Sequence, residues 1–336
     1  MARYEYELPE ELIAQQPLPR GSSRLLVLNR ASGRLEDRVF RDIVEFVHAG
    51  DVLVVNDTRV SARRYAATDP QGRQAEVLLI RPVGEMGWEA LVYPGKRLKP
   101  GTAVILQAGD LGDVQASIVQ TTSEGGRIIE VENPAIRDAL KARGEVPLPP
   151  YIRSPIEDED RYQTVYAFAE GSAAAPTAGL HFTEELLGRI RERGAAIVPI
   201  TLHVGVDTFR PVRVEDPAQH KMHGEWFTIG SEAATLINQR RGKLIAVGTT
   251  VVRALETVAD ASGQVHPTSG LTKLFIRPGH RFRAVEALLT NFHLPRSTLL
   301  MLVCAFAGYE STMRAYRHAV TARYRFYSFG DAMLIR

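Results

Sequence analysis

The segment LIAVGTTVVRALE, residues 244–256, has the pattern of a short buried strand, a glycine turn and a helix. The same alternation continues on both sides of it. Strands are expected over 197–204 and 287–290, and helices are expected after the capping residues Thr183, Ser231 and Ser297. This alternation predicts an α/β domain with a mainly parallel sheet, either barrel-like or open, whose functional sites lie at the carboxyl ends of its strands.

Residues 61–148 have a different pattern, in which short β-type runs alternate with turns rich in glycine and proline. The runs are 75–80, 88–93, 102–106, 114–120 and 127–131. Runs of this length and spacing predict a small antiparallel β-barrel. We therefore expect a discontinuous catalytic α/β domain, residues 1–60 and 149–336, into which a β-barrel domain, residues 61–148, is inserted. Near the N-terminus, the sequence predicts a helix over 42–48 and a strand over 51–55.

The composition of the 336 residues is that of a globular enzyme, with 45% hydrophobic and 24% charged residues. Cys304 is the single cysteine, which excludes a disulfide framework, a cysteine-based zinc site and a cysteine-ligated iron–sulfur cluster held by this chain. The N-terminus lacks the apolar core of a secretory signal, and the longest apolar run, 299–307, is too short to span a bilayer. We expect a cytoplasmic protein that does not bind a membrane.

The formal net charge of +2 neither requires nor excludes a nucleic-acid partner, so the distribution of charge is more informative. Basic residues outnumber acidic ones over 59–99 and over 311–336, and the second region interleaves arginines with tyrosines and phenylalanines. Arginine next to aromatic rings suits phosphate contacts and stacking on unpaired bases. The alternative is a solvated basic helix whose aromatic side chains pack inward.

Five polar segments lie at predicted strand ends or in turns. They are 56–59, 175–182, 203–209, 248–253 and 290–295. Because loops at one end of a sheet converge in space, we expect the five segments to form one pocket. The alternative is that their Asn, Asp and Thr residues only cap helices and form turns.

Four histidines also lie in polar or glycine-bearing loops: His181, His203, His223 and His293. An imidazole is the natural proton carrier for a reaction without a metal, although each ring could instead be structural and bonded to the backbone. His220 and His223 with Glu225 have ligand-like chemistry, but no H-E-x-x-H motif is present and we expect no metal site. The sequence also lacks a Walker loop, a dinucleotide-binding turn and a serine-hydrolase elbow.

Several motifs are long enough to indicate a family. They are NDTRV (56–60), PTAGLHF (176–182), TLHVG (201–205), TFRPV (208–212), AVGTTVVRALE (246–256), TNFHLP (290–295) and YRFYSFGDAM (324–333). With these motifs the chain resembles the S-adenosylmethionine:tRNA ribosyltransferase-isomerases of queuosine synthesis. The resemblance runs from end to end and is loosest over 65–130. Asp207 and Trp226 depart from the family pattern.

The resemblance implies an unusual use of S-adenosylmethionine. The ribosyl moiety, rather than the methyl group, is transferred to 7-aminomethyl-7-deazaguanine at the wobble position of a tRNA and is isomerised. The product is epoxyqueuosine, and adenine and methionine are released. S-adenosylmethionine is then a co-substrate, and we expect no prosthetic group and no metal ion. We also expect a monomer whose partners are the modified tRNA and S-adenosylmethionine.

This chemistry, which the resemblance implies, requires residues in three roles. The predicted catalytic residues are His203 or His181, as the base that removes a proton made acidic by the sulfonium, and His293 or Asp57, as the partner of the departing adenine. The predicted S-adenosylmethionine-binding residues are Thr177, Gly179, Phe182, Thr208, Glu225, Gly248, Thr249, Thr250, Arg253, Asn291 and Phe292. The predicted tRNA-binding residues are Arg59, Arg63, Arg64, Lys96, Arg97 and Arg325.

Two rival functions use some of the same features. A non-catalytic RNA-binding protein would explain the basic regions and the β-barrel, but it would not need five polar segments around a parallel sheet. A conventional S-adenosylmethionine-dependent methyltransferase would release S-adenosylhomocysteine instead of adenine and methionine. The reaction products therefore discriminate among the three functions.

Overall fold

The computed structural model of the chain describes residues 1–123, 125–205, 216–220, 222 and 224–336. The chain divides into two units. The larger unit comprises Met1–Thr58, Pro150–Ala169 and Ala175–Arg336, and the smaller unit comprises Arg59–Pro149 and Glu170–Ala174. The segment 170–174 is therefore grouped with the smaller unit, whereas the predicted boundaries assign it to the larger domain.

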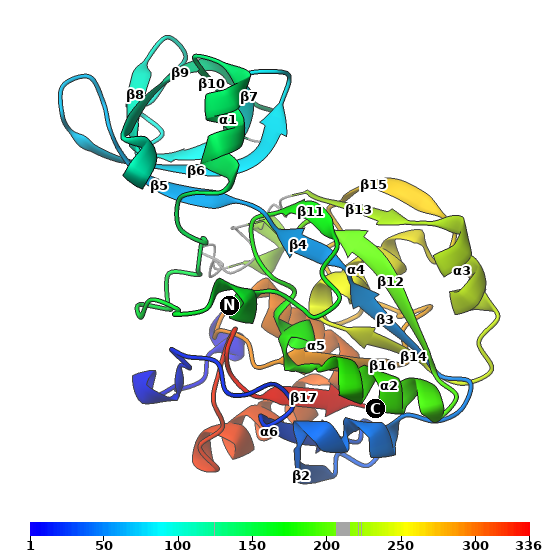
Figure 1. The fold of residues 1–336 in the computed structure, drawn as a ribbon. Helices are drawn as coiled ribbons and strands as arrows, with labels where there is room; N and C mark the ends of the chain where they lie inside the picture. The colour runs from blue at the N-terminus through cyan, green and yellow to red at the C-terminus, as the bar shows by residue number, and fades with distance from the viewer. Residues whose placement is uncertain (124, 206–215, 221, 223) are drawn as a thin grey trace. The chain divides into compact units, whose positions relative to one another are not determined.

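A nine-stranded open sheet forms the centre of the larger unit (Figure 1). Its order is β15 (Thr268–Thr272), β13 (Glu225–Ile229), β12 (Ala196–Leu202), β3 (Val52–Asn56), β14 (Leu244–Val247), β16 (Ala287–Asn291), β17 (Ala332–Ile335), β1 (Arg24–Leu28) and β2 (Leu35–Val39). β12, β3, β14 and β16 are parallel neighbours, and so are β17 and β1. The other neighbours are antiparallel. The predicted α/β fold is confirmed, and its sheet is open.

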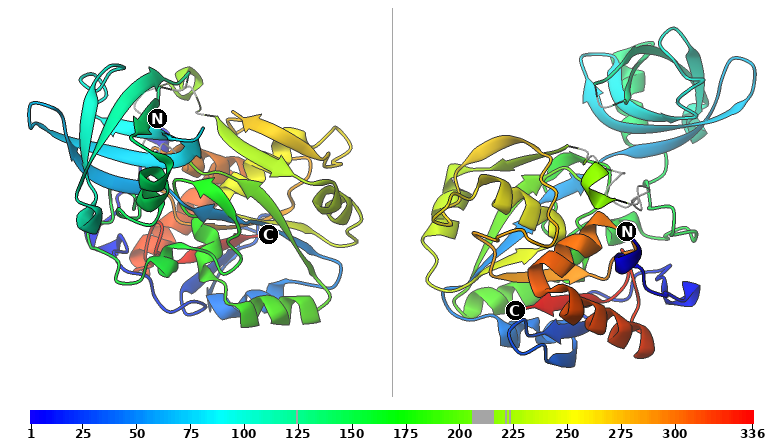
Figure 2. Two further views of the ribbon diagram at one scale, coloured as in Figure 1. Left: turned by 45° about the horizontal axis from the view of Figure 1, so that its top comes forward. Right: turned by 180° about the vertical axis from the view of Figure 1, so that it is seen from behind.

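The central strands are apolar at consecutive positions because both faces of the sheet are covered. On one face Leu53, Val55 and Ile245 join a hydrophobic cluster with Leu186 of α2 and Phe40 of the 3-10 helix η3. The other face is covered by α4, α5 and α6, which come forward when the molecule is seen from behind (Figure 2). The bounds of these helices are α2 Glu184–Glu192, η3 Phe40–Phe46, α4 Thr249–Val258, α5 Thr298–Ala307 and α6 Tyr309–Thr321, and α3 (Ser231–Asn238) contacts β12.

Local sequence signals set most of the helix starts. The side chains of Thr183 and Ser297 each accept a hydrogen bond from the backbone N–H three residues on, at 3.0 and 3.1 Å, which confirms both predicted caps. The prediction that Ser231 caps α3 is wrong, because Gly230 occupies the cap position and α3 begins at Ser231 itself. The helix predicted over 42–48 is instead the 3-10 helix η3, which is tighter than an α-helix, has the same length and begins two residues earlier.

The smaller unit contains a closed six-stranded antiparallel barrel, which confirms the predicted barrel. Its order is β10 (Arg127–Val131), β7 (Gly87–Tyr93), β6 (Gln74–Val83), β5 (Arg63–Thr68), β8 (Ala103–Gln107) and β9 (Asp113–Thr121). β5 lay outside the predicted runs. The core of the barrel buries Tyr65 of β5, Trp88 of β7 and Leu140 of helix α1 (Pro134–Lys141).

The remaining elements are short. They are β4 (Thr58–Val60) and β11 (Ala169–Ser172), which pair with each other, and the 3-10 helices η1 (Ala2–Tyr4), η2 (Glu10–Leu12), η4 (Gly109–Leu111), η5 (Glu159–Tyr162), η6 (Thr177–His181) and η8 (Pro217–Gln219). Of these, η6 matters most for function, because it carries residues that line the cavity described next.

Candidate active site

The carboxyl ends of the four central parallel strands lie at one edge of the sheet. β12 ends at Leu202, β3 at Asn56, β14 at Val247 and β16 at Asn291. β17 runs antiparallel to β16, so the segment that precedes β17 reaches the same edge. The polar segments that follow these strands therefore start side by side, which is where α/β proteins bind their ligands.

A cavity with about 630 Å³ of space, counted out to the open solvent, lies at this edge. Its lining residues are Tyr151, Ala175, Pro176, Thr177, Ala178, Val204, Gly248, Thr249, Thr250, Thr290, Asn291, Phe292, His293, Leu294, Ser297, Leu299, Tyr327 and Ser328. The cavity thus brings together parts of four of the predicted polar segments, the exception being 56–59.

Asn291 is a buried amide in the cavity lining. Its Nδ2 donates to the carbonyl oxygen of Tyr327 at 2.8 Å. Burial lowers the pKa of His181 to about 4, although the neighbouring Asn291 side chain favours the protonated ring. His181 is itself 5% exposed, contacts Ser23 Oγ at 3.0 Å and does not line the cavity. His181 therefore stands behind Asn291 as a neutral ring. Among the described residues, Asn291 Oδ1 has no hydrogen-bond partner of normal geometry.

His293 lines the cavity directly. Its Nε2 lies 2.7 Å from Thr290 Oγ1, and its backbone N–H donates to Tyr316 Oη at 3.0 Å. Burial lowers the pKa of His293 to about 3. The ring is therefore neutral near pH 7 and can act there as a hydrogen-bonding group rather than as a cation.

His203 follows β12, and its hydrogen bonds define which nitrogen is basic. Nδ1 lies 2.8 Å from the hydroxyl of Thr58, which itself donates to the carbonyl oxygen of Ala169 at 3.2 Å. Because a hydroxyl has one hydrogen, the neutral His203 ring donates from Nδ1 and carries its lone pair on Nε2. The ring also stacks on Trp226, with centroids 5.3 Å apart and planes at 18°. These contacts hold His203 in the orientation and tautomer that a base requires.

Asn56 ends the adjacent strand β3, and Asp57 follows it. The amide of Asn56 bonds both the N–H and the carbonyl of Leu202, at 2.9 and 2.8 Å, and so ties the ends of β3 and β12 together. Asp57 Oδ1 accepts from the hydroxyl of Thr201 at 2.7 Å. Burial raises the pKa of Asp57, although this hydrogen bond opposes the rise.

Helix α4 begins at the cavity. Gly248 has a φ of 100°, a conformation that favours glycine, and no side chain caps the helix. The first N–H groups of a helix have no partner within it, and they carry partial positive charge. Since Gly248, Thr249 and Thr250 all line the cavity, this helix start offers a place for a carboxylate.

Four predicted S-adenosylmethionine contacts do not line the cavity. Glu225 and Arg253 form an ion pair with each other, each with 4% of its side chain exposed. Phe182 is fully buried in the core. A Cβ on Gly179 would lie 2.1 Å from Tyr166 Oη, so this glycine allows close packing. Another predicted S-adenosylmethionine contact, Thr208, lies outside the described residues. The same is true of His223, one of the four histidines that the sequence analysis singled out.

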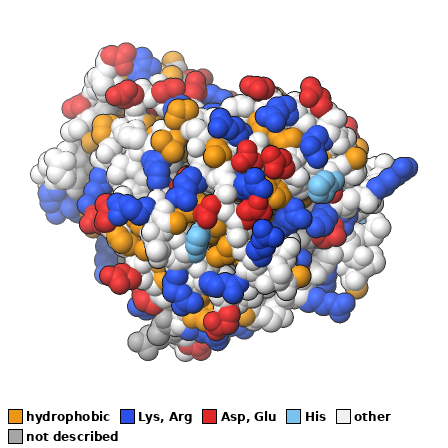
Figure 3. All heavy atoms as spheres, turned by 90° about the horizontal axis from the view of Figure 1, so that it is seen from below, with side chains coloured by type: hydrophobic (Ala, Val, Ile, Leu, Met, Phe, Trp, Pro, Cys, Tyr) orange, Lys and Arg blue, Asp and Glu red, His pale blue; other side chains and the backbone are white. Residues whose placement is uncertain are grey.

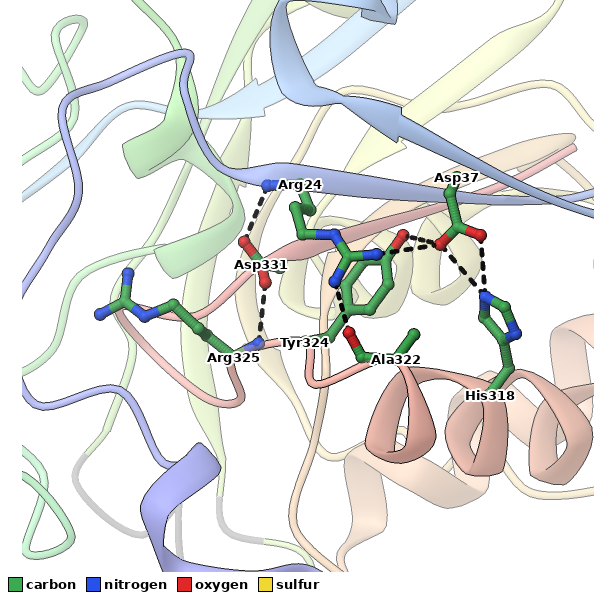
Figure 4. Close-up of polar contacts among 7 residues, drawn as sticks. All are labelled: Arg24, Asp37, His318, Ala322, Tyr324, Arg325 and Asp331. Atoms are coloured by element: carbon green, nitrogen blue, oxygen red, sulfur yellow. Dashed lines mark hydrogen bonds and ion pairs between the residues drawn. The ribbon is translucent and has the colours of Figure 1, made fainter.

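The loop over 325–331 is held by a buried carboxylate (Figure 4). Asp331 is 1% exposed and accepts from the backbone N–H groups of Arg24 and Arg325, at 2.8 and 2.7 Å. The Arg24 guanidinium lies over the Tyr324 ring, 3.7 Å from its centroid, and donates to Ala322. These contacts fix the loop that carries Tyr327 and Ser328 to the cavity.

Two further features concern the described residues as a whole. Within ranges 1–123, 125–205, 216–220 and 224–336, no three His, Cys, Asp or Glu side chains are placed to hold a metal ion. In the same part of the chain, no helix has both the length and the hydropathy needed to cross a bilayer.

Comparisons with known proteins account for the whole chain. A family model described as queuosine biosynthesis protein matches residues 1–335. The chain belongs to this family. It is 55% identical to an S-adenosylmethionine:tRNA ribosyltransferase-isomerase from Symbiobacterium thermophilum, across 100% of this chain and 99% of the relative. It is 52% identical to the protein of that name from Caldanaerobacter subterraneus, across 99% of each chain.

A solved structure agrees with both the family and the fold. The crystal structure of S-adenosylmethionine tRNA ribosyltransferase from Thermotoga maritima covers 99% of this chain and 100% of its own, with 38% identity and a TM-score of 0.56. The resemblance inferred from the motifs is therefore confirmed, as is the prediction of an α/β fold with a small barrel.

The predicted tRNA contacts of this queuosine biosynthesis family member differ in their surroundings. Arg59 and Lys96 are exposed. Arg64 pairs with Glu76 at 3.5 Å and Arg97 with Asp69 at 2.9 Å, both within the barrel unit. The other two members of the set, Arg63 and Arg325, donate to the backbone carbonyls of Lys141 and Gln16. On the face shown in Figure 3, basic and acidic side chains are interspersed, so this face has no extended field of one sign.

Some lining residues of this family member were missed by the sequence reasoning. They are Tyr151, Ser297, Tyr327 and Ser328 among the polar or aromatic ones. Tyr151 Oη lies 2.8 Å from Ser328 Oγ, and the rings of Tyr151 and Tyr327 are 4.7 Å apart. Tyr327 and Ser328 belong to a motif that marks the family, which was an available signal. Tyr151 lies in a proline-rich connector, where no sequence signal marked it as a lining residue.

Proposed function

We propose that this chain transfers the ribosyl moiety of S-adenosylmethionine to 7-aminomethyl-7-deazaguanine at the wobble position of a tRNA and isomerises it, releasing adenine and methionine. The observation that carries the proposal is full-length similarity to proteins named S-adenosylmethionine:tRNA ribosyltransferase-isomerase, at 50 to 55% identity. S-adenosylmethionine is the co-substrate. We expect no prosthetic group, a cytoplasmic location and a monomer.

S-adenosylmethionine binds, on this proposal, in the cavity at the carboxyl ends of the parallel strands. The start of α4 at Gly248 receives the methionine carboxylate, because its N–H groups and helix dipole favour an anion. Asn291 also lines the cavity, and we assign the ribose to its side of the cavity. The hydroxyls of Thr249 and Thr250 lie in the same lining for the remaining polar groups.

His203 serves as the base. It takes a proton from the carbon next to the sulfonium, and the electron pair of that C–H bond stays on the carbon. Nε2 carries the lone pair because Nδ1 donates to Thr58. Neither His203 nor His181 lines the cavity, although Val204, which follows His203, does. His181 is the weaker candidate because it is 5% exposed and burial lowers its pKa to about 4, whereas His203 is half-buried.

Two leaving groups depart with their bonding electrons. Adenine takes the pair of its bond to the ribose and needs a hydrogen bond or a proton at a ring nitrogen. His293 is our choice for this partner because it lines the cavity, whereas Asp57 does not. The electron pair on the carbon next to sulfur forms a double bond to the neighbouring ribose carbon and breaks that carbon's bond to the ring oxygen, whose electrons form a carbonyl as adenine leaves. The amine of the deazaguanine adds to this double bond and gives up a proton, and the carbon next to sulfur then closes on the carbonyl carbon. The alkoxide so formed displaces methionine as a neutral thioether, which gives the epoxide. Fixed dipoles and hydrogen bonds of this kind are a main catalytic device of enzymes.

The test uses S-adenosylmethionine labelled in the ribose and a tRNA that carries 7-aminomethyl-7-deazaguanine. We expect label in the tRNA and equal amounts of adenine and methionine. Release of S-adenosylhomocysteine would indicate a methyltransferase, and tRNA binding without any turnover would indicate a non-catalytic RNA-binding protein. Either result overturns the proposal.

His203→Ala tests the base. The variant should lose adenine release while it still binds S-adenosylmethionine, and His48→Ala, which changes an exposed histidine, should behave as the wild type. Near-normal turnover by His203→Ala would remove His203 from this role. Since tRNA contacts through Arg59 and Lys96 would be electrostatic, tRNA affinity should also fall steeply as salt is raised.

A further inference from the structure

Among the described residues of the larger unit, two large aromatic side chains are exposed. Phe168 is 83% exposed and Trp226 is 40% exposed. Isolated apolar side chains at a surface are ordinary and need no explanation. These two differ because both are attached to the hydrogen-bond network that orients His203.

A short series of contacts joins the backbone of Phe168 to the ring of Trp226. The backbone N–H of Phe168 donates to the carbonyl of Asp57 at 2.7 Å. Thr58, the residue after Asp57, contacts His203 Nδ1 through its hydroxyl at 2.8 Å. The ring of His203 stacks on Trp226, and its backbone N–H donates to the Trp226 carbonyl at 2.9 Å. Two different segments of the chain, one carrying Phe168 and the other Trp226, are thus linked to the proposed base.

We propose that Phe168 and Trp226 stack on unpaired nucleobases of an RNA loop and hold the reacting nucleotide open beside His203. This inference rests on the proposed function and adds to it the surface that receives the RNA. Proteins recognise unpaired bases of RNA loops by stacking them on aromatic side chains, which tolerates different bases because every base has a π-face. One face of Trp226 is occupied by His203, and the exposed part of its ring is available to a base.

The surroundings of Trp226 suit RNA. Leu271, which is 57% exposed, pairs with Trp226 across β13 and β15 and widens the apolar surface. Lys273 is exposed and lies beside Gly224, two residues before Trp226. The adenine of S-adenosylmethionine is the other nucleobase in the reaction. We assign the rings to RNA because neither Phe168 nor Trp226 lines the cavity.

Fluorescence gives a direct test, because the chain has two tryptophans and the other, Trp88, is fully buried in the barrel. The signal of Trp226 is the difference in emission between the wild type and Trp226→Phe. An anticodon stem-loop RNA should quench this signal, whereas a blunt double-stranded RNA of equal length and S-adenosylmethionine alone should not. Fluorescence anisotropy of the labelled RNA reports binding independently of tryptophan.

Variants test the stacking. Phe168→Ala and Trp226→Ala should each weaken binding of the stem-loop about tenfold. Phe168→Tyr keeps an aromatic ring and should bind the stem-loop as the wild type does. Leu236→Ala, a control at a 42% exposed apolar residue of α3, should also bind it as the wild type does. Phe168→Ala should raise the KM for tRNA without changing affinity for S-adenosylmethionine. It is the sharper variant, because Trp226→Ala also removes the ring on which His203 stacks.

The outcomes separate this inference from the proposed function. If the stem-loop binds by anisotropy without quenching Trp226, and Phe168→Ala binds it as the wild type, the stacking surface is wrong while ribosyl transfer can still be observed. Quenching by S-adenosylmethionine alone would assign the ring to the co-substrate and would also overturn it. If the wild type neither binds the stem-loop nor releases adenine with the modified tRNA, both proposals fail.

Discussion

Acidification should destabilise the larger unit through its buried histidines. His181 is 5% exposed, and burial lowers its pKa to about 4 from the ordinary value of 6.5. Between these two values the unfolded chain binds a proton that the folded chain does not, so the free energy of unfolding falls as the pH falls. The contribution of His181 is fully present above pH 6.5. Between pH 8 and pH 5 its loss amounts to about 2 kcal/mol. His293, with a pKa of about 3, adds a loss of similar size.

His181→Gln isolates this effect, because glutamine does not titrate. The variant should be less stable than the wild type at pH 8, since it loses the ring that stacks on Phe40. The difference should then shrink by about 2 kcal/mol as the pH is lowered to 5. Urea unfolding followed by the helical circular dichroism signal measures it, because α2 to α6 belong to the larger unit.

The matched control is His48→Gln, which changes an exposed histidine of the same unit and should keep the wild-type pH dependence. A constant difference in stability between wild type and His181→Gln from pH 8 to pH 5 would refute the reasoning. It would mean that the folded protein accepts a proton on His181 as easily as the unfolded chain does.

Three further changes test packing, capping and charge in the larger unit. Gly179→Ala places a Cβ 2.1 Å from Tyr166 Oη, and should lower the unfolding free energy by about 1–3 kcal/mol in urea titrations. Ser297→Ala removes the cap of α5 and should cost about 1 kcal/mol, measured in the same way. Arg253→Met leaves the Glu225 carboxylate buried without its cation and should lower the free energy of unfolding by about 3–5 kcal/mol. The double variant with Glu225→Leu should recover most of this loss. No recovery would contradict the ion pair.

Much of the fold was predictable because it follows from local patterns. The run 244–247 is apolar at every position since both faces of the sheet are covered, and such runs separated by helices indicate a parallel sheet. Caps at Thr183 and Ser297 were predictable because the hydroxyl bonds a backbone group only three residues away. The cap at Ser231 was not, since a glycine can occupy the same position without any side-chain bond.

The candidate site was less predictable, because it depends on pairings between distant residues. Glu225 and Arg253 look like ligands for a sulfonium and a carboxylate, but each already has a buried partner in the other. The spacing of these residues in the sequence does not predict the ion pair, which joins β13 to α4. In the same way, a histidine in a polar motif does not disclose whether it faces a cavity, as His293 does, or stands behind an amide, as His181 does.

The strand order constrains how the proposed reaction is laid out. Neighbouring strands are ~4.8 Å apart, so His203 at the end of β12 and Asn291 at the end of β16, three strands away, are separated by ~14 Å. A single ring of the substrate therefore cannot contact both His203 and Asn291. In S-adenosylmethionine the sulfonium lies between the ribose and the methionine carboxylate. With the ribose at Asn291 and the carboxylate at Gly248, the molecule must therefore bend for its sulfonium to face the β12 side. Proton removal by His203 then requires the sulfonium end of the ribose to point toward β12. The attacking amine must reach that same end, and the proposed stacking of RNA bases on Phe168 and Trp226 is the step that delivers it there.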